Sequence, residues 1–209
     1  MQDEETGTWW QQVSGEAILG PLKGKSLKPI EWDEVGFGVW KRENPQGIVL
    51  KDNEKQRKYY DPEDWETRIL KRPTVTRHKS DDPLKPRDLV IGVEWSGISK
   101  AYLFETLKKQ NPFMDTVGNM PLLLVVDIDG KSLRCFDRKL DGKLYDFFLR
   151  PNQTTLNLFD SQTGSGWDFS GTAISGALKG KRLSRIPALK DFWFDWKIYH
   201  PLTKVYVGT

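Results

Sequence analysis

The sequence contains the same stretch of residues twice, 156 positions apart. One copy runs from Ser14 to Leu27 and the other from Ser170 to Leu183, and both follow the pattern Ser-Gly-x-Ala-Ile-x-Gly-x-Leu-Lys-Gly-Lys-x-Leu. The correspondence continues to Val49 and Val205, with 15 identities in 36 aligned positions. Such agreement is far above chance and indicates a duplicated structural unit, called the tail below. Upstream of these stretches the alignment shifts by one residue, and Thr6-Gly7-Thr8-x-Trp10 then matches Thr163-Gly164-Ser165-x-Trp167.

Each tail is predicted to contain short strands, a short helix and a closing strand. Glycines punctuate the apolar pieces, which is typical of strands joined by tight turns. Apolar residues at helical spacing predict helices within 34–43 and 189–199. Each helix ends where a residue precedes proline, because such a residue is pushed out of the helical region. Residues 48–50 and 204–207 are then expected to form the closing strands.

Residues 89–160 form the head that precedes the second tail. The pattern predicts a strand over 89–95, a turn at 96–99, a returning strand over 100–103 and a helix over 104–109. Residues 122–126 are expected to be a central buried strand, 132–137 alternate, and 144–149 are expected to pair back after the Asp141-Gly142 turn. The fold is therefore predicted to be α+β and predominantly antiparallel β, a tandem pseudo-repeat with short aromatic helices packed on sheets.

The predicted domain organisation has three parts. Residues 1–50 are the tail half of a first repeat, 51–88 are a connector, and 89–209 are a complete second repeat that forms one compact unit with the first tail. Prolines and charged residues dominate the connector. It is expected to be an extended segment pinned to a surface by Tyr59, Tyr60 and Trp65.

Composition narrows the possible functions. The net charge is only +3 and acidic and basic residues are interspersed, which argues against nucleic-acid binding. The basic run 68–79 is best interpreted as a solvated linker. The single cysteine, Cys135, is predicted to be a half-buried structural thiol, and neither a metal site nor a cofactor is predicted. No apolar run is long enough to span a membrane, and the acidic N-terminus is not a signal peptide.

Eight short motifs follow one another along the chain. They are Val90-Ile91-Gly92-Val93, Lys100-Ala101-Tyr102, Asp115-Thr116-Val117-Gly118, Phe136-Asp137-Arg138, Asp141-Gly142-Lys143, Asp160-x-x-Thr163-Gly164-Ser165-x-Trp167, Gly171-x-Ala173-x-x-Gly176-x-Leu178-x-Gly180 and Phe192-Trp193-Phe194-x-Trp196. In this order they resemble the prokaryotic family called domain of unknown function 3179, over essentially the whole chain.

The resemblance implies a tandem pseudo-repeat in which each repeat has a head and a tail. It also implies a periplasmic or extracellular location, because many members carry export signals, but it implies no reaction. Members usually carry a Cys-Pro-Leu-Cys motif in the first head and an asparagine before the Asp-Thr-Val-Gly turn, where this chain has Met114. The resemblance leads us to expect that this chain corresponds to the C-terminal portion of such a protein and starts within the first repeat.

Three functions are compatible with these patterns. The first is a non-enzymatic binding or assembly module, part of a larger protein or complex, whose partner is another polypeptide that supplies the missing head, or a second copy of the chain. The second is a carbohydrate-binding or carbohydrate-acting protein that stacks sugars on tryptophans. The third is a metal-dependent enzyme that uses aspartates such as Asp115, Asp127, Asp137 and Asp160. Buried tryptophans in both tails would favour the first function, and a coplanar exposed row the second.

No catalytic set is predicted, and the Gly-x-x-Gly-x-Leu-Lys-Gly-Lys stretch does not have the spacing of a phosphate-binding loop. The candidate ligand or interface residues are Trp9, Trp10, Trp32, Trp40, Asp115, Asp137, Arg138, Asp160 and Trp167. Seven of the nine tryptophans lie in the tails, where matching positions indicate core more often than ligand platform. The first tail is expected to leave aromatic surface that another structure must cover.

Overall fold

A computed structural model describes residues 1–209 except 13, 29–31, 75–80, 151–155 and 209. The described chain divides into two compact units, Met1–Asp33 and Glu34–Thr209. The division falls inside the segment 1–50 that the sequence pattern groups as one tail. The helix of the first tail thus belongs to the same unit as residues 89–209.

The unit Met1–Asp33 is small and built from turns. Its two short strands, β1 (Trp9–Trp10) and β2 (Ala17–Leu19), pair antiparallel. Gly20 stands in the left-handed region with φ of 108°, and a Cβ there would lie 2.8 Å from the Cα of Thr8. Glycine is the one residue that tolerates both the dihedral and the close approach.

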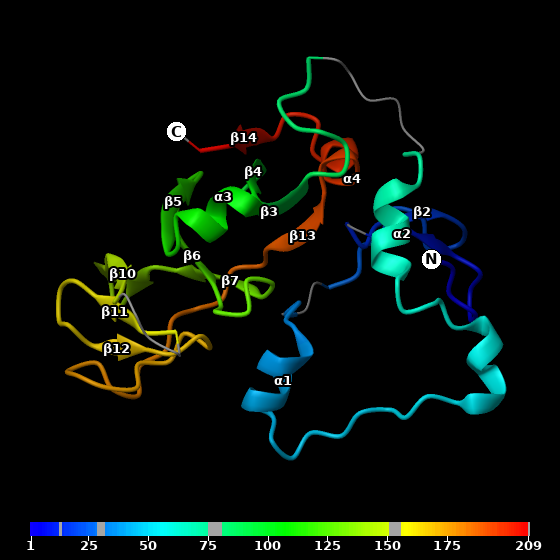
Figure 1. The fold of residues 1–209 in the computed structure, drawn as a ribbon. Coiled ribbons are helices and arrows are strands. Elements are labelled where there is room, and N and C mark those ends of the chain that lie inside the picture. The colour runs from blue at the N-terminus through cyan, green and yellow to red at the C-terminus, as the bar shows by residue number, and fades with distance from the viewer. Residues whose placement is uncertain (13, 29–31, 75–80, 151–155, 209) are drawn as a thin grey trace. The chain divides into compact units, whose positions relative to one another are not determined.

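The unit Glu34–Thr209 is organised around two sheets (Figure 1). The first has the order β13-β3-β4-β14 and the second the order β5-β6-β7. Their strands are β3 (Leu89–Trp95), β4 (Ile98–Leu103), β5 (Phe113–Val117), β6 (Met120–Val126), β7 (Leu133–Asp137), β13 (Leu189–Phe192) and β14 (Lys204–Tyr206). All pairs in these two sheets are antiparallel except β14 with β4, which is parallel.

Smaller elements complete this unit. A sheet of order β10-β11-β12 and a hairpin of β8 and β9 lie beyond β7 in the chain. Their bounds are β8 (Lys139–Leu140), β9 (Lys143–Leu144), β10 (Phe147–Leu149), β11 (Leu158–Asp160) and β12 (Gly166–Trp167). The helices are α1 (Phe37–Glu43), α2 (Trp65–Lys71), α3 (Phe104–Lys109) and α4 (Trp193–Tyr199), with a 3₁₀ helix over Glu54–Tyr59. The predicted α+β class with mostly antiparallel sheets is confirmed.

Strand alternation sets up three hydrophobic clusters. Ile91 and Val93 of β3 face one cluster, which they share with Leu122 and Leu124 of β6. The intervening Val90 faces a different cluster under α4. Likewise Leu123 and Val125 of β6 face a third cluster, formed with the second tail and with α1. Because successive strand residues point to opposite faces, each sheet is buried on both sides.

The head follows the sequence prediction closely. The hairpin between β3 and β4 turns at Ser96 and Gly97, both with positive φ, as a two-residue turn of this hand requires. Asp141 and Gly142 form a second such turn between β8 and β9. Strand β6 is central in its sheet, and helix α3 has the predicted bounds.

Three local predictions are wrong. Residues 48–50 form no strand. The segment 144–149 does not pair back as one strand, because its last three residues form β10 and pair with β11. The connector is not an extended pinned segment, since it contains α2 and the 3₁₀ helix, and Tyr59, Tyr60 and Trp65 are exposed. The end of the basic run, from residue 75, lies outside the described residues.

Within the part of the chain that the structure describes, no helix combines the length and the apolarity that crossing a membrane requires.

Candidate functional site

Two ion pairs hold helix α1 on the β6–β7 hairpin, and the helix supplies the cation of one and the anion of the other. Arg42 contacts Asp127, just after β6, with 3.0 Å between Nη2 and Oδ2. The next residue, Glu43, holds Arg134 of β7 with both carboxylate oxygens, at 2.5 and 2.7 Å. The side chains of Asp127 and Arg134 are only 1% and 3% exposed. Since a buried charge without its partner is costly, the two pairs fix the face on which α1 docks.

The start of α1 is anchored by the turn that joins the same two strands. The N–H of Gly36 donates to Ser132 Oγ at 2.8 Å, and that hydroxyl donates to Asp129 Oδ2 at 2.6 Å. Burial raises the pKa of Asp129, but the hydrogen bonds from Ser132 and from the Lys131 N–H, with the charge of Lys190, together hold the pKa below its usual value. Val39, in the middle of the helix, is buried against the second tail.

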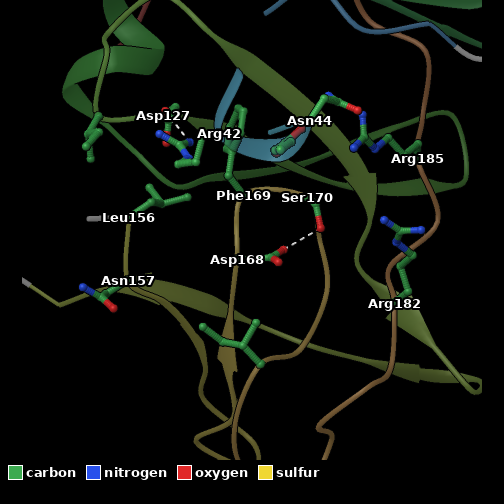
Figure 2. A pocket seen from close by; sticks show the side chains of 13 residues that line it. Arg42, Asn44, Asp127, Leu156, Asn157, Asp168, Phe169, Ser170, Arg182 and Arg185 are labelled. Atoms are coloured by element: carbon green, nitrogen blue, oxygen red, sulfur yellow. Dashed lines mark hydrogen bonds and ion pairs between the residues drawn. The ribbon is translucent and has the colours of Figure 1, made fainter. Parts of the chain in front are cut away.

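A pocket of about 760 Å³ opens at the C-terminal end of α1 (Figure 2). Its wall combines Arg42 from the helix, Asp127 from the end of β6, Phe169 from the second tail, and Arg182 and Arg185 from the segment that leads to β13. Five of its lining residues are arginine or aspartate, and Leu156 and Ile174 add apolar surface, so the pocket combines charged and apolar groups. Volumes of this size are typical of small-molecule sites.

The opposite face of α1 is only partly covered. Phe37 and Trp40 stack on each other with their ring centroids 5.7 Å apart, and Phe37 is 61% exposed. The residues at the matching positions of α4 are Trp193 and Trp196, which are 1% and 3% exposed. Trp196 lies on β3 so closely that a Cβ on Gly92 would be 2.2 Å from its ring. The two helices therefore bury different faces.

Asp160 and Trp167 have a structural role. The Asp160 carboxylate accepts hydrogen bonds from the Thr163 N–H at 2.6 Å, from the Thr163 hydroxyl at 2.9 Å and from the Trp167 indole N–H at 2.9 Å. Both residues are fully buried. This network closes the turn that opens the second tail, and it leaves neither residue accessible to a ligand.

The same network occurs in the first tail around Asp3. Its carboxylate accepts from the Thr6 N–H at 2.6 Å, from the Thr6 hydroxyl at 2.9 Å and from the Trp10 indole N–H at 2.8 Å. These hydrogen bonds lower the pKa of Asp3 to about 2, and the bond from Trp10 has the largest effect. Extending the upstream match by three residues would have paired Asp3 with Asp160, and this signal in the sequence was missed.

Asp115 lies in a separate partly buried cluster. Its Oδ2 accepts from Lys100 Nζ at 2.5 Å and from the Tyr102 hydroxyl at 2.9 Å. Burial, followed by the charge of Asp115, raises the pKa of Tyr102 far above its usual range. Because Tyr102 belongs to the core between the two sheets, these groups tie β5 to β4.

Asp137 and Arg138 stabilise the chain after β7. Asp137 Oδ1 accepts from the Lys139 N–H at 2.7 Å, which closes a turn. Arg138 Nη1 contacts Asp146 at 2.5 Å and the Tyr145 carbonyl oxygen at 3.2 Å. Neither side chain lines the pocket beside α1.

The predicted site residues thus do not form one site, although Asp160 and Trp167 are hydrogen-bonded to each other. Trp9 and Trp32 are exposed and Trp10 is half-buried, all in the unit Met1–Asp33, whereas Trp40 is half-buried on α1. The residues that surround the pocket, above all Arg42, Arg182 and Arg185, were not predicted. Arg42 is far in sequence from the neighbouring Arg182 and Arg185, so the docking of α1 brings the three to one site.

Cys135 is fully buried rather than half-buried, which corrects the sequence prediction. Burial raises the pKa of its thiol far above the usual value. Among the described residues, no group of three or more His, Cys, Asp or Glu side chains is arranged to hold a metal ion.

Comparison with protein-family models identifies the chain. The model described as "Protein of unknown function (DUF3179)" matches residues 1–203. The chain belongs to the DUF3179 family. The resemblance carried by the motifs between Val90 and Trp196 is thereby confirmed. Neither the curated proteins nor the solved structures contain a match to this chain.

Proposed function

We propose that this DUF3179 chain is a non-enzymatic binding and assembly module. Its open surface consists of the Phe37 and Trp40 face of α1 together with residues 48–50, and is called the docking surface below. The observation that carries the proposal is the contrast with the second tail. There, the segment that matches 48–50 is β14, which pairs with β4.

Residues 48–50 have the composition of a strand but, within the described chain, they form none. Ile48 and Leu50 are 95% and 98% exposed. Three consecutive apolar residues in water are unfavourable, and pairing them at the edge of a sheet would bury them. The expected occupant is therefore a β-sheet edge.

The helix face points to the same occupant. In the second tail, α4 covers the β3–β4 hairpin with Trp193 and Trp196, and a glycine in β3 makes room for the indole. A partner for α1 needs the same features, namely a two-stranded hairpin with a small residue opposite Trp40 and a free edge for residues 48–50.

We favour another polypeptide over a second copy of this chain. In this chain β3 already pairs with β13 on one side, and β4 pairs with β14 on the other. A second copy would have to release one of these strands before it could accept residues 48–50. From the resemblance to the family, the assembly is expected outside the cytoplasm.

The other two functions have less support. Trp167, Trp193 and Trp196 are buried, so they offer no row of rings to a sugar. The aspartates proposed for metal-dependent chemistry are engaged elsewhere, since Asp115 pairs with Lys100 and Asp160 closes a turn. The expected sign of an assembly module was burial of the tryptophans in both tails. They are buried in the second tail, whereas Trp9 and Trp32 of the first tail are exposed.

Site-specific photocrosslinking tests the proposal. A benzophenone amino acid replaces Val49 in the full chain, expressed in its native host, and the crosslinked peptides are identified by mass spectrometry. We expect one partner polypeptide, crosslinked within a β-hairpin. The Phe37→Ser variant should lose this product while its circular dichroism stays unchanged, because Phe37 is exposed.

Leu202 provides the matched control position. It is 93% exposed and lies between α4 and β14, in the tail whose surface is already covered. The same probe there should give no specific partner. Equal products from both positions, crosslinks confined to the chain itself, or a partner contacted outside any strand would each contradict the proposal. A dimer of this chain, detected by light scattering, would replace the other polypeptide by a second copy.

A further inference from the structure

The pocket beside α1 contains a buried carboxylate oxygen with no partner. Asp127 is 3% exposed, and its Oδ2 is held by Arg42. Its Oδ1 is buried as well, but it accepts no hydrogen bond from the described residues. Leaving such an atom unsatisfied is costly, so a donor from a bound molecule would be stabilised there.

Arg182 supplies a donor group that the fold does not require. The matching position of the first tail is Ser26. Both tails nevertheless make the same hydrogen bonds in this region, including Leu27 N–H to Gly15 O and Leu183 N–H to Gly171 O, each at 2.9 Å. The side chain of Arg182 is exposed and lines the pocket, as Figure 2 shows.

The remaining wall suits a sugar-sized molecule. Leu156 and Ile174 offer apolar surface beside the polar groups. Arginine guanidinium groups bind carboxylates through two parallel hydrogen bonds. Because Asp127 Oδ2 already pairs with Arg42, Oδ1 is left to accept a hydrogen bond from a hydroxyl group.

We propose that this pocket binds a hydroxylated carboxylate of about the size of a sugar acid. The carboxylate of the ligand contacts Arg182, and one hydroxyl group donates to Asp127 Oδ1. This inference does not depend on the docking surface, because the pocket lies on the other side of α1 and is formed wholly by residues of the unit Glu34–Thr209.

Isothermal titration of the full chain with three probes tests the inference. The probes are D-glucuronate, D-glucose, which has the hydroxyl groups alone, and sulfate, which has the charge alone. We expect glucuronate to bind at least about tenfold more tightly than either of the others. The Arg182→Gln and Asp127→Asn variants should each weaken glucuronate binding by about tenfold, which corresponds to about 1.4 kcal/mol.

Lys179→Gln is the matched control, because Lys179 is an exposed cation in the same tail that does not line the pocket. It should leave binding unchanged. If Asp127→Asn weakens the packing of α1, the Arg182→Gln variant still tests the proposal, because Arg182 is exposed. Equal binding of sulfate would reduce the pocket to an anion site, equal binding of glucose would remove the role of Arg182, and no binding of glucuronate at millimolar concentration would overturn the proposal.

Discussion

Helices α1 and α4 occupy matching positions of the two tails but dock through different faces. In α4, Trp193 and Trp196 lie on the β3–β4 hairpin, whereas Ile198 and Tyr199 are exposed. In α1, the residues at the positions of Ile198 and Tyr199 are Arg42 and Glu43, and these are the ones that contact the protein. Of the aromatic residues of α1, Phe37 is exposed and Trp40 is half-buried.

This difference shows how a few substitutions redirect a repeated element. Residues 39, 42 and 43 share one face of a helix, and 37 and 40 share another. The first face carries the two charged residues that pair with Asp127 and Arg134, and also the buried Val39. The shared Trp-Lys pair, Trp40-Lys41 and Trp196-Lys197, does not by itself determine the packing.

The largest expected effect concerns the two matching tryptophans. Trp196→Ala should lower the free energy of unfolding by about 3–5 kcal/mol, because it removes a buried indole that lies on Gly92 and donates to Thr203. Trp40→Ala should cost only about 1 kcal/mol, since that side chain is half-buried. Urea denaturation measures both values. Equal losses would mean that the two helix faces are equally buried in solution.

The next effect concerns the ion pairs of α1. Glu43→Gln should lower the free energy of unfolding by about 2 kcal/mol, because it removes the carboxylate charge that pairs with the buried guanidinium of Arg134. It should also speed proteolysis after α1, measured by limited digestion. Tyr199→Gln, at the matching position of α4, should change stability by less than about 0.5 kcal/mol, since Tyr199 is exposed. A Glu43→Gln variant as stable as the parent would show that α1 docks without its charges.

The smallest effect depends on pH. Burial, followed by the charges of Asp195 and Glu34, raises the pKa of Asp191 to about 6. A raised carboxyl pKa means that the folded state binds the proton more tightly than the unfolded state, so ionisation destabilises the fold as the pH rises from about 4 to above 6. Asp191→Asn should therefore stabilise the protein at pH 8 by roughly 1 kcal/mol, a value reduced by partial exposure, and have no effect near pH 4.

Thermal unfolding of both proteins across this pH range measures the difference. The matching residue of the first tail is Val35, so no such titration is expected there. An Asp191→Asn variant that is less stable at pH 8 would show that the ionised carboxylate is favourable, and that its hydrogen bond from the Phe192 N–H dominates.

The sequence predicted most local structure of the head, because hydrophobic alternation and turn residues act over a few positions. The turns at Ser96-Gly97 and Asp141-Gly142 and the bounds of α3 are examples. The sequence-based prediction failed where a strand has to pair with residues far away in the chain. Residues 48–50 have the same apolar pattern as a strand, yet a strand needs a neighbour, and the pattern cannot say whether one is present.

The candidate site could not be predicted from sequence patterns, again because its residues are distant in the chain. Arg42, Asp127 and Arg182 come from three distant segments, and no local spacing connects them. By itself, the sequence determined the repeated tail, its glycine turns and the family, because these depend on residues close together in the chain. Only the tertiary structure decided which face of α1 is buried, since that choice depends on the charges of Asp127 and Arg134 in a hairpin about ninety residues away.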